Sequence, residues 1–347
     1  MTRTILYFLI ISLHIRCVDP IDLVDSDQAI SMLVINGKIS KTNKKGYVAV
    51  DLIQSTFNTD RSFGVTASEV AVVNEKGEKL VLEKLQIGRY AASETAAFPF
   101  VYGKLYKISV INGKDIYESN FMELNISPLI QNSALNFTPK IDENKGSTGK
   151  IAISINTVFK ESDKNKFLKW ELLRSYQLTE QEFSGPQGRK CYVLNNKDDK
   201  LNEKLLDGRD FNVNKPFDFV VTDRSVDNLF AEGTYYTIIQ EAIDFSTFKY
   251  FQVYNNLVQR KGNIFETPPG PMPTNFRCVS DSTKLVNGYF YATQQDTSRI
   301  FIDPSKVGNP KRLCPVPPVE FNACPVVQCC DCLKLKNGTI LKPFYWN

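Results

Sequence analysis

Closely spaced cysteines are the residues of the carboxyl-terminal region that can do chemistry. Cys329-x-x-Cys332 has the spacing of half a zinc site, because two thiolates on one tight turn can ligate the same ion. Upstream, Cys314 and Cys324 stand too far apart to form a second such pair. In an exported protein the alternative is disulfides, which stabilise a loop-rich segment by restricting its unfolded state. We therefore favour disulfides over zinc and expect no metal and no cofactor.

The full set of disulfide candidates contains the seven cysteines that follow Cys17. They are Cys191, Cys278, Cys314, Cys324, Cys329, Cys330 and Cys332. Seven is an odd number, so one thiol is left over or pairs between molecules. The spacing alone does not fix which cysteines pair.

The scarcity of histidine excludes whole classes of enzyme. The single histidine, His14, lies in the predicted signal peptide, whereas catalytic triads, Cys-His catalysis and His-Glu-x-x-His zinc proteases all need an imidazole. No Gly-x-Ser-x-Gly elbow, Walker loop, dinucleotide fingerprint or calcium loop is present in the sequence. We predict no catalytic residue. A hydrolase that acts on a glycan or peptide through carboxylates remains the alternative, because that chemistry needs no histidine.

The amino terminus predicts export. Arg3 is followed by the apolar run 5–11 and then by Cys17. The length of the apolar run is typical of secretory signals and too short to span a bilayer. We expect a signal peptide over residues 1–16, a lipid on Cys17, and an acidic tether over residues 17–28. The residues before Cys17 are bulkier than is usual at a lipidation site. A plain signal with a free thiol at Cys17, or a misassigned start codon, therefore stays open.

The charge of the chain gives no indication of a nucleic-acid partner. The formal net charge is +4, and two of the positive charges, Arg3 and Arg16, lie in the predicted signal peptide. We find no run of basic residues with interleaved aromatics. A protein that binds phosphate backbones needs such a basic patch, so we expect no nucleic-acid binding.

Apolar runs separated by turn residues predict strands along most of the chain. We expect a mainly β protein with two sandwich domains of the immunoglobulin or fibronectin kind, over residues 29–125 and 126–306. Asn36-Gly37 and Asn112-Gly113 predict hairpin turns, because Asn-Gly readily adopts the positive φ angles that such turns require.

The second half of the chain mixes strands, a loop and a helix. The alternating run 150–155 predicts a strand, and 167–173 is its candidate partner. The polar segment 180–210 predicts a long loop. Apolar residues spaced by three and four predict an amphipathic helix over residues 245–258. We expect the Cys-rich segment 307–347 to pack on the second domain.

Several motifs together resemble a known family. They are Cys17-Val-Asp-Pro-Ile-Asp-Leu23, Asn263-Ile-Phe-Glu-Thr-Pro-Pro269, Gly288-Tyr-Phe290, and an ending with Cys329-Cys-Asp-Cys332, Asn337-Gly-Thr339 and Lys342-Pro-Phe-Tyr-Trp346. In this order they resemble the Bacteroidota lipoproteins grouped as domain of unknown function 4249, and the resemblance covers almost the whole chain. It implies an outer-membrane lipoprotein that partners a TonB-dependent transporter, and the family supplies no catalytic residues.

From these features we expect a lipid-anchored accessory protein that helps a TonB-dependent outer-membrane transporter to capture its substrate. The lipid at Cys17 would hold it on the outer membrane, facing the cell surface or the periplasm. The alternatives are the carboxylate-dependent hydrolase and a structural or adhesion protein of the envelope. A docking partner requires an exposed apolar or aromatic patch, because stable interfaces commonly bury about 1,200–2,000 Å².

Overall fold

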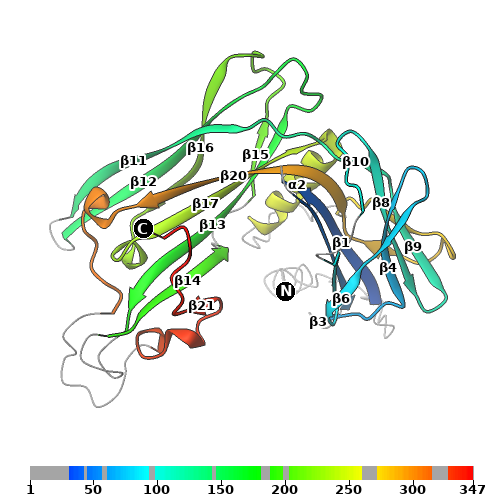
Figure 1. Ribbon diagram of the computed structural model, residues 1–347, viewed down its shortest axis with the longest axis horizontal. Coiled ribbons are helices and arrows are strands. Elements are labelled where there is room, and N and C mark those ends of the chain that lie inside the picture. Colours follow the sequence, from blue (N-terminus) through cyan, green and yellow to red (C-terminus); the bar gives the residue numbers. More distant parts are fainter. Residues whose placement is uncertain are drawn as a thin grey trace, which may run out of the picture.

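Three β-sheets, of twelve, six and three strands, make up most of the fold. The structure is a computed structural model, and it describes residues 31–42, 45–56, 61–93, 98–142, 146–180, 188–197, 203–259, 272–314 and 327–346. Figure 1 shows them arranged as an arch, with one β-sandwich on each side. The expected mainly β fold is confirmed. The immunoglobulin or fibronectin character of the two sandwiches remains a prediction.

The twelve-stranded sheet runs through both sides of the arch. In spatial order it contains β21 (Gly338–Thr339), β14 (Lys190–Lys197), β13 (Phe167–Thr179), β17 (Thr234–Ile243), β20 (Phe290–Ile302), β1 (Ser31–Lys41), β2 (Gly46–Thr56), β7 (Arg89–Ala91) and β6 (Glu83–Gln86), with β15 (Lys204–Asp207) on β13, β19 (Val286–Asn287) on β1 and β3 (Arg61–Gly64) on β2.

The two smaller sheets each cover one part of this long sheet. The six-stranded sheet contains β18 (Phe276–Cys278), β9 (Asp115–Ser119), β8 (Leu105–Asn112), β4 (Glu69–Asn74) and β5 (Lys79–Val81), with β10 (Met122–Glu123) on β8. The three-stranded sheet contains β11 (Ile130–Asp142), β12 (Gly146–Val158) and β16 (Pro216–Ser225). The helices are α2 (Phe245–Val258) and the 3-10 turns η3 (Asn228–Phe230), η4 (Pro304–Val307), η5 (Val327–Cys329) and η6 (Cys332–Lys334).

Each sandwich has its own core. In the first, alternate residues of β2 point inward, so Val50 and Leu52 are fully buried and pack with Ile108 and Val110 of β8. In the second, β13 and β17 pack on β12 and β16. Trp170 of β13 stacks on Phe219 of β16 with ring centroids 4.5 Å apart, so these facing layers bury aromatic area as well as aliphatic side chains.

One strand belongs to both sandwiches. The first five residues of β20, 290–294, pair in parallel with β1, and residues 295–302 pair antiparallel with β17. β18 also returns to the first sandwich, where it pairs with β9. Residues C-terminal to the expected boundary at 125 thus complete the first sandwich, and the boundaries themselves remain a prediction.

The helix α2 begins and ends at the predicted residues, Phe245 and Val258. Its start is fixed by Asp244, whose carboxylate accepts a hydrogen bond from the Thr247 backbone N–H at 2.7 Å. On its apolar face Phe251 packs against Tyr291 of β20, with ring centroids 5.5 Å apart. The helix therefore covers the region where the two sandwiches share β20.

The turn prediction at Asn36-Gly37 is wrong, whereas the one at Asn112-Gly113 is confirmed. Gly113 adopts a φ of 65° between β8 and β9. Asn36-Gly37 instead lies inside β1. A Cβ on Gly37 would come within 3.1 Å of Phe290 Cδ2 and 3.2 Å of Ile108 Cγ1, so this glycine serves close packing between layers rather than a turn.

Two further expectations for the second half need correction. The strand that contains 150–155 is β12, and it pairs with β11 and β16 rather than with 167–173, which belongs to β13 in the other layer. The segment 180–210, expected to be a loop, contributes β14 and β15. In β14 only Cys191, Tyr192 and Val193 are buried, so the exposed polar residues around them conceal the strand in the sequence.

Candidate docking surface of the carboxyl-terminal segment

Two disulfides between described cysteines hold the carboxyl-terminal segment. Cys332 bonds to Cys191 of β14, across a sequence separation of 141 residues, and Cys314 bonds to Cys329. The first bond attaches the segment to the second sandwich, and the second closes a short loop within the segment. Such cross-links stabilise a fold mainly by restricting the unfolded chain.

The remaining candidate cysteines are in different states. Cys330 is also disulfide-bonded. Cys278, on β18 of the first sandwich, is a buried free thiol. Cys324 and the predicted lipid site Cys17 lie outside the described residues. The preference for disulfides over zinc is therefore supported for the described part of the tail.

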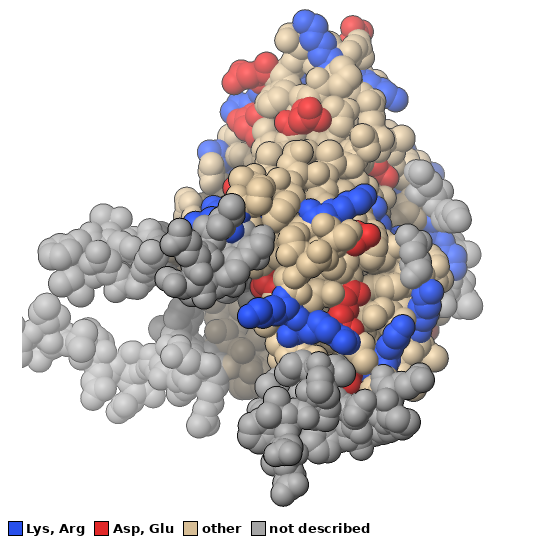
Figure 2. Space-filling view, turned by 90° about the vertical axis from the view of Figure 1, so that its left-hand side faces the viewer, with Lys and Arg blue, Asp and Glu red and all other residues tan. Residues whose placement is uncertain are grey.

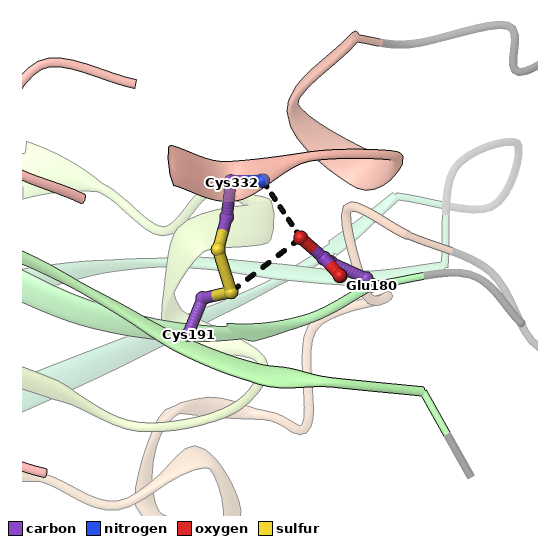
Figure 3. A group of neighbouring side chains, drawn as sticks. All are labelled: Glu180, Cys191 and Cys332. Carbon is purple, nitrogen blue, oxygen red and sulfur yellow. Dashed lines mark hydrogen bonds between the residues drawn. A yellow bond between two sulfur atoms is a disulfide. The ribbon is translucent and has the colours of Figure 1, made fainter. Parts of the chain in front are cut away.

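A buried carboxylate lies beside the long-range disulfide (Figure 3). Glu180 is fully buried, and its Oε1 accepts a hydrogen bond from the Cys332 backbone N–H at 2.8 Å. Glu180, Cys191 and Cys332 would be a possible metal-ligand set. Because the two sulfurs are bonded to each other, however, neither is a thiolate that could bind an ion.

The charge of Glu180 is balanced by Arg189. The guanidinium donates to both carboxylate oxygens, with Nη2 at 2.8 Å from Oε1 and Nε at 2.9 Å from Oε2. The same Nη2 also contacts Asp331 Oδ1 at 3.1 Å. The hydrogen bonds to Glu180 raise the pKa of Arg189. This bidentate pair fixes the start of η6 on the β13–β14 hairpin, and nothing in the sequence spacing of the three residues indicates it.

The last aromatic residues anchor the end of the chain. Trp346 is buried against Tyr192 and Tyr235, with ring centroids 5.1 Å and 5.0 Å away. Tyr345 also packs on Tyr235, and its hydroxyl lies 3.3 Å from the Ser175 hydroxyl. β21 adds two residues to the edge of β14. The tail is thus held by disulfides, strand pairing and aromatic packing together.

On the same segment four large apolar side chains are exposed: Leu333 in η6 at 48%, and three closer to the end of the chain. Ile340 is 50% exposed, Leu341 is 76% exposed and Phe344 is 92% exposed. Phe344 directly precedes the anchored pair Tyr345 and Trp346, so its backbone is fixed while its ring faces solvent. Exposed apolar side chains that stand close together in the sequence on a fixed backbone are candidates for a protein-binding surface. We call residues 340, 341 and 344 the tail patch.

A second feature that sequence reasoning missed is a buried chain of charges where the sandwiches join. Glu241 of β17 is fully buried and contacts Lys38 of β1 and, at 2.9 Å, Lys169 of β13. Lys169 is 2% exposed and also contacts Glu203 at 3.2 Å, which in turn pairs with Lys197 at 2.9 Å. The only signal in the sequence is a charged residue within an apolar run, at Lys169 and at Glu241.

Ion pairing controls the ionisation of these groups. Burial by itself would raise the pKa of Glu241, but Lys169 and Lys38 outweigh that effect and hold the pKa well below its usual range. Burial by itself would lower the pKa of Lys169, but Glu241 holds it well above its usual range. Burial also raises the pKa of Tyr291, whose hydroxyl donates to Glu241, to about 12. Each buried charge in this row of ion pairs has a partner of opposite sign, so the ion pairs serve as a structural contact.

Charge at the surface is mixed in sign. On the face shown in Figure 2, Lys and Arg side chains lie close to Asp and Glu side chains. The described part of this face therefore has no large field of one sign that would favour a polyanion. Among the described residues no helix is both long and apolar enough to cross a membrane.

Comparison with known proteins identifies a family. The family model described as Domain of unknown function (DUF4249) matches residues 18–299. A search of curated proteins found no match. Among solved structures, a DUF4785 family protein from Legionella pneumophila is similar with 12% identity and a TM-score of 0.19; the alignment covers 64% of this chain, and this chain spans 55% of the length of that protein. A TM-score this low supports no argument about fold or function. Because the family model matches most of the sequence, the chain belongs to the family Domain of unknown function (DUF4249).

Proposed function

We propose that this chain is a non-catalytic, lipid-anchored outer-membrane protein that docks on a TonB-dependent transporter and helps it to capture a nutrient. The tail patch is the observation that supports docking best. Its three exposed apolar side chains stand on a segment that disulfides and aromatic packing already hold in place. A preformed surface loses little conformational entropy when a partner binds.

The membrane anchor of the proposal is Cys17, and the tether behind it would let the arch reach its partner. Replacing Cys17 by Ala should move the protein from the outer-membrane fraction to the soluble fraction of the cell. The transporter is removed from the cell so that docking cannot hold the protein at the membrane. If the Cys17→Ala protein still stays in the membrane fraction, lipid anchoring is contradicted.

Docking is tested by co-purification from detergent-solubilised outer membranes. The wild-type protein should bring a transporter with it, and the double variant Leu341→Asp, Phe344→Asp should not, because two charges would enter an apolar contact. The matched control is Leu285→Asp, a leucine that is 69% exposed on the first sandwich. Recovery of monomer alone under mild conditions, or equal loss in the control, would count against docking through the tail patch.

The carboxylate hydrolase is the second candidate, because one pocket carries two acidic residues. Glu123 and Asp163 both line it. Glu123 accepts a hydrogen bond from Lys164 at 3.0 Å, and Asp163 accepts one from the Lys160 backbone N–H at 2.8 Å. A hydrolase of this kind needs two carboxylates that flank the scissile bond, one of them acting as a general acid. Release of reducing ends from glycans, or of new amino termini from peptides, would support the hydrolase.

A structural role in the envelope instead predicts that nutrient uptake is unchanged when the gene is lost.

A further inference from the structure

A pocket of about 160 Å³ lies where the two sides of the arch meet, apart from the tail patch. The first sandwich contributes Tyr102 and residues 123–126 around β10, and the second contributes residues 162–165 from the loop between β12 and β13. A site built from two units is a common place for a small ligand.

Two asparagines form the polar floor of this pocket. Asn165 Nδ2 donates to Asn125 Oδ1 at 2.6 Å. Asn125 is only 6% exposed, and its backbone is fixed by hydrogen bonds with Ala292 and Gln294. The bond between the amides leaves Asn125 Nδ2 as a donor and Asn165 Oδ1 as an acceptor, neither with a hydrogen-bond partner among the residues that the structure describes. Both groups can therefore bind a ligand hydroxyl. The pocket is also lined by Tyr102, whose buried hydroxyl has no hydrogen-bond partner among the described residues.

The remaining polar groups select the charge of that ligand. Lys164 and Glu123 form an ion pair across the rim, and Ser162 adds a hydroxyl with no partner in the described part of the chain. Two carboxylates, Glu123 and Asp163, and one ammonium group, that of Lys164, line the pocket, and this excess of negative charge disfavours an anion. The Asn125 donor and the Lys164 ammonium disfavour a bare cation. Hydroxyl groups, which both donate and accept, fit this mixture of donors and acceptors.

Apolar groups and size narrow the ligand further. Tyr102, Leu124 and Ile126 line the pocket beside the polar floor, and Ile126 is 57% exposed. The C–H groups on the face of a sugar ring can pack against these side chains. The volume suits one sugar ring and is well below the roughly 300–1,000 Å³ of pockets for drug-sized ligands.

We propose that this pocket binds one neutral, hydroxyl-rich unit, such as the terminal ring of a saccharide. The proposal rests on the proposed function, since it names the chemical class of nutrient that the accessory protein presents to the transporter. In this arrangement Asn125 donates to one ligand hydroxyl, Asn165 accepts from a neighbouring hydroxyl, and Ile126 packs on the ring.

Saturation-transfer NMR on the purified, disulfide-bonded protein tests the pocket without any transporter. The probes are the methyl glycosides of glucose, galactose, mannose, xylose and N-acetylglucosamine. At least one should bind the wild type. Asn125→Asp, which keeps the Oδ1 acceptor and removes the donor, should weaken that binding about tenfold. Ser162→Phe, which fills the pocket from an exposed position, should abolish it, and the matched control Ser282→Phe on an exposed loop should leave it unchanged.

Several outcomes would overturn the proposal. The first is that none of these glycosides binds, and the second is that binding survives in a folded Ser162→Phe variant. The third is that the pocket binds calcium or inorganic phosphate instead. Because these measurements use the isolated protein, their failure is distinct from failure of docking, which the tail patch variants test. Glycoside binding with no transporter recovered would leave the pocket assignment intact and remove the docking proposal alone.

Discussion

The junction between the sandwiches and the attachment of the carboxyl-terminal segment are held by different chemistry. At the junction a chain of buried ion pairs centred on Glu241 and Lys169 joins β1, β13 and β17. The tail is attached by the disulfide Cys191–Cys332 and by Trp346. Of the described residues in the first sandwich only Cys278 is a cysteine, and it is unbonded. The junction should therefore respond to pH and the tail to reduction.

The largest expected effect comes from breaking the ion chain. Replacing Glu241 by Gln leaves Lys169 buried without its main counter-charge, which should lower the free energy of unfolding by about 3–5 kcal/mol. Urea unfolding at neutral pH measures it. The control is Glu171→Gln, whose side chain is 23% exposed at the outer end of the chain and whose loss should cost under about 1 kcal/mol. Equal effects of the two variants would contradict a central role for Glu241.

Removing the long-range disulfide should have the next largest effect. The double variant Cys191→Ala, Cys332→Ala should lose about 2–4 kcal/mol, because the unfolded chain regains the freedom of a long loop. A reducing agent should destabilise the wild type by more than this double substitution does, because it also breaks Cys314–Cys329 and the disulfide of Cys330. Hydrogen exchange should locate the loosening in residues 327–346. Loosening of β1 and β2 instead would show that the two regions are not independent.

Acid should weaken the junction more than the tail. The pKa of Glu241 is depressed in the folded state, so the stability it contributes is present above its unfolded pKa of about 4.3 and is lost as pH falls toward the folded value. The melting temperature of the wild type should therefore fall more steeply below pH 4.3 than that of Glu241→Gln. Parallel melting curves for the two proteins would show that other carboxylates dominate the acid response.

Packing at Gly37 should have a smaller effect. Gly37→Ala places a methyl group against Phe290 and Ile108, and overpacking of this kind costs about 1–3 kcal/mol. Thermal unfolding measures the loss. Gly113→Ala is unsuitable as a control because Gly113 adopts a positive φ. The control is Ser282→Ala at an exposed position, which should change the free energy of unfolding by less than about 0.5 kcal/mol. A neutral Gly37→Ala would mean that the layers can separate locally.

Local features of this fold are visible in the sequence, and long-range ones are not. The helix 245–258 follows from apolar residues spaced by three and four, a signal that lies within the segment itself. The Asn-Gly rule succeeds at Asn112-Gly113 and fails at Asn36-Gly37, because packing against Phe290, far along the chain, decides the latter. The division of β20 between β1 and β17 likewise depends on partners that its own residues do not specify.

The candidate sites follow the same rule. The cysteines of the tail indicate disulfides, but which cysteines pair depends on how β14 reaches the tail. Asn125 and Asn165 of the pocket meet only because β10 and the β12–β13 loop lie side by side in the fold. The tail patch has a local signal, the apolar and aromatic residues near the carboxyl end. Only the structure separates the buried Trp346 from the exposed Phe344.

Photo-crosslinking in intact cells tests docking through the tail patch most directly. A photoreactive amino acid replaces Phe344 in one strain and Leu285 in another, and crosslinked products are identified by mass spectrometry. We expect a TonB-dependent transporter to be crosslinked from position 344 and not from position 285. A crosslink of equal yield from both positions, or none to any outer-membrane transporter from position 344, would contradict the account.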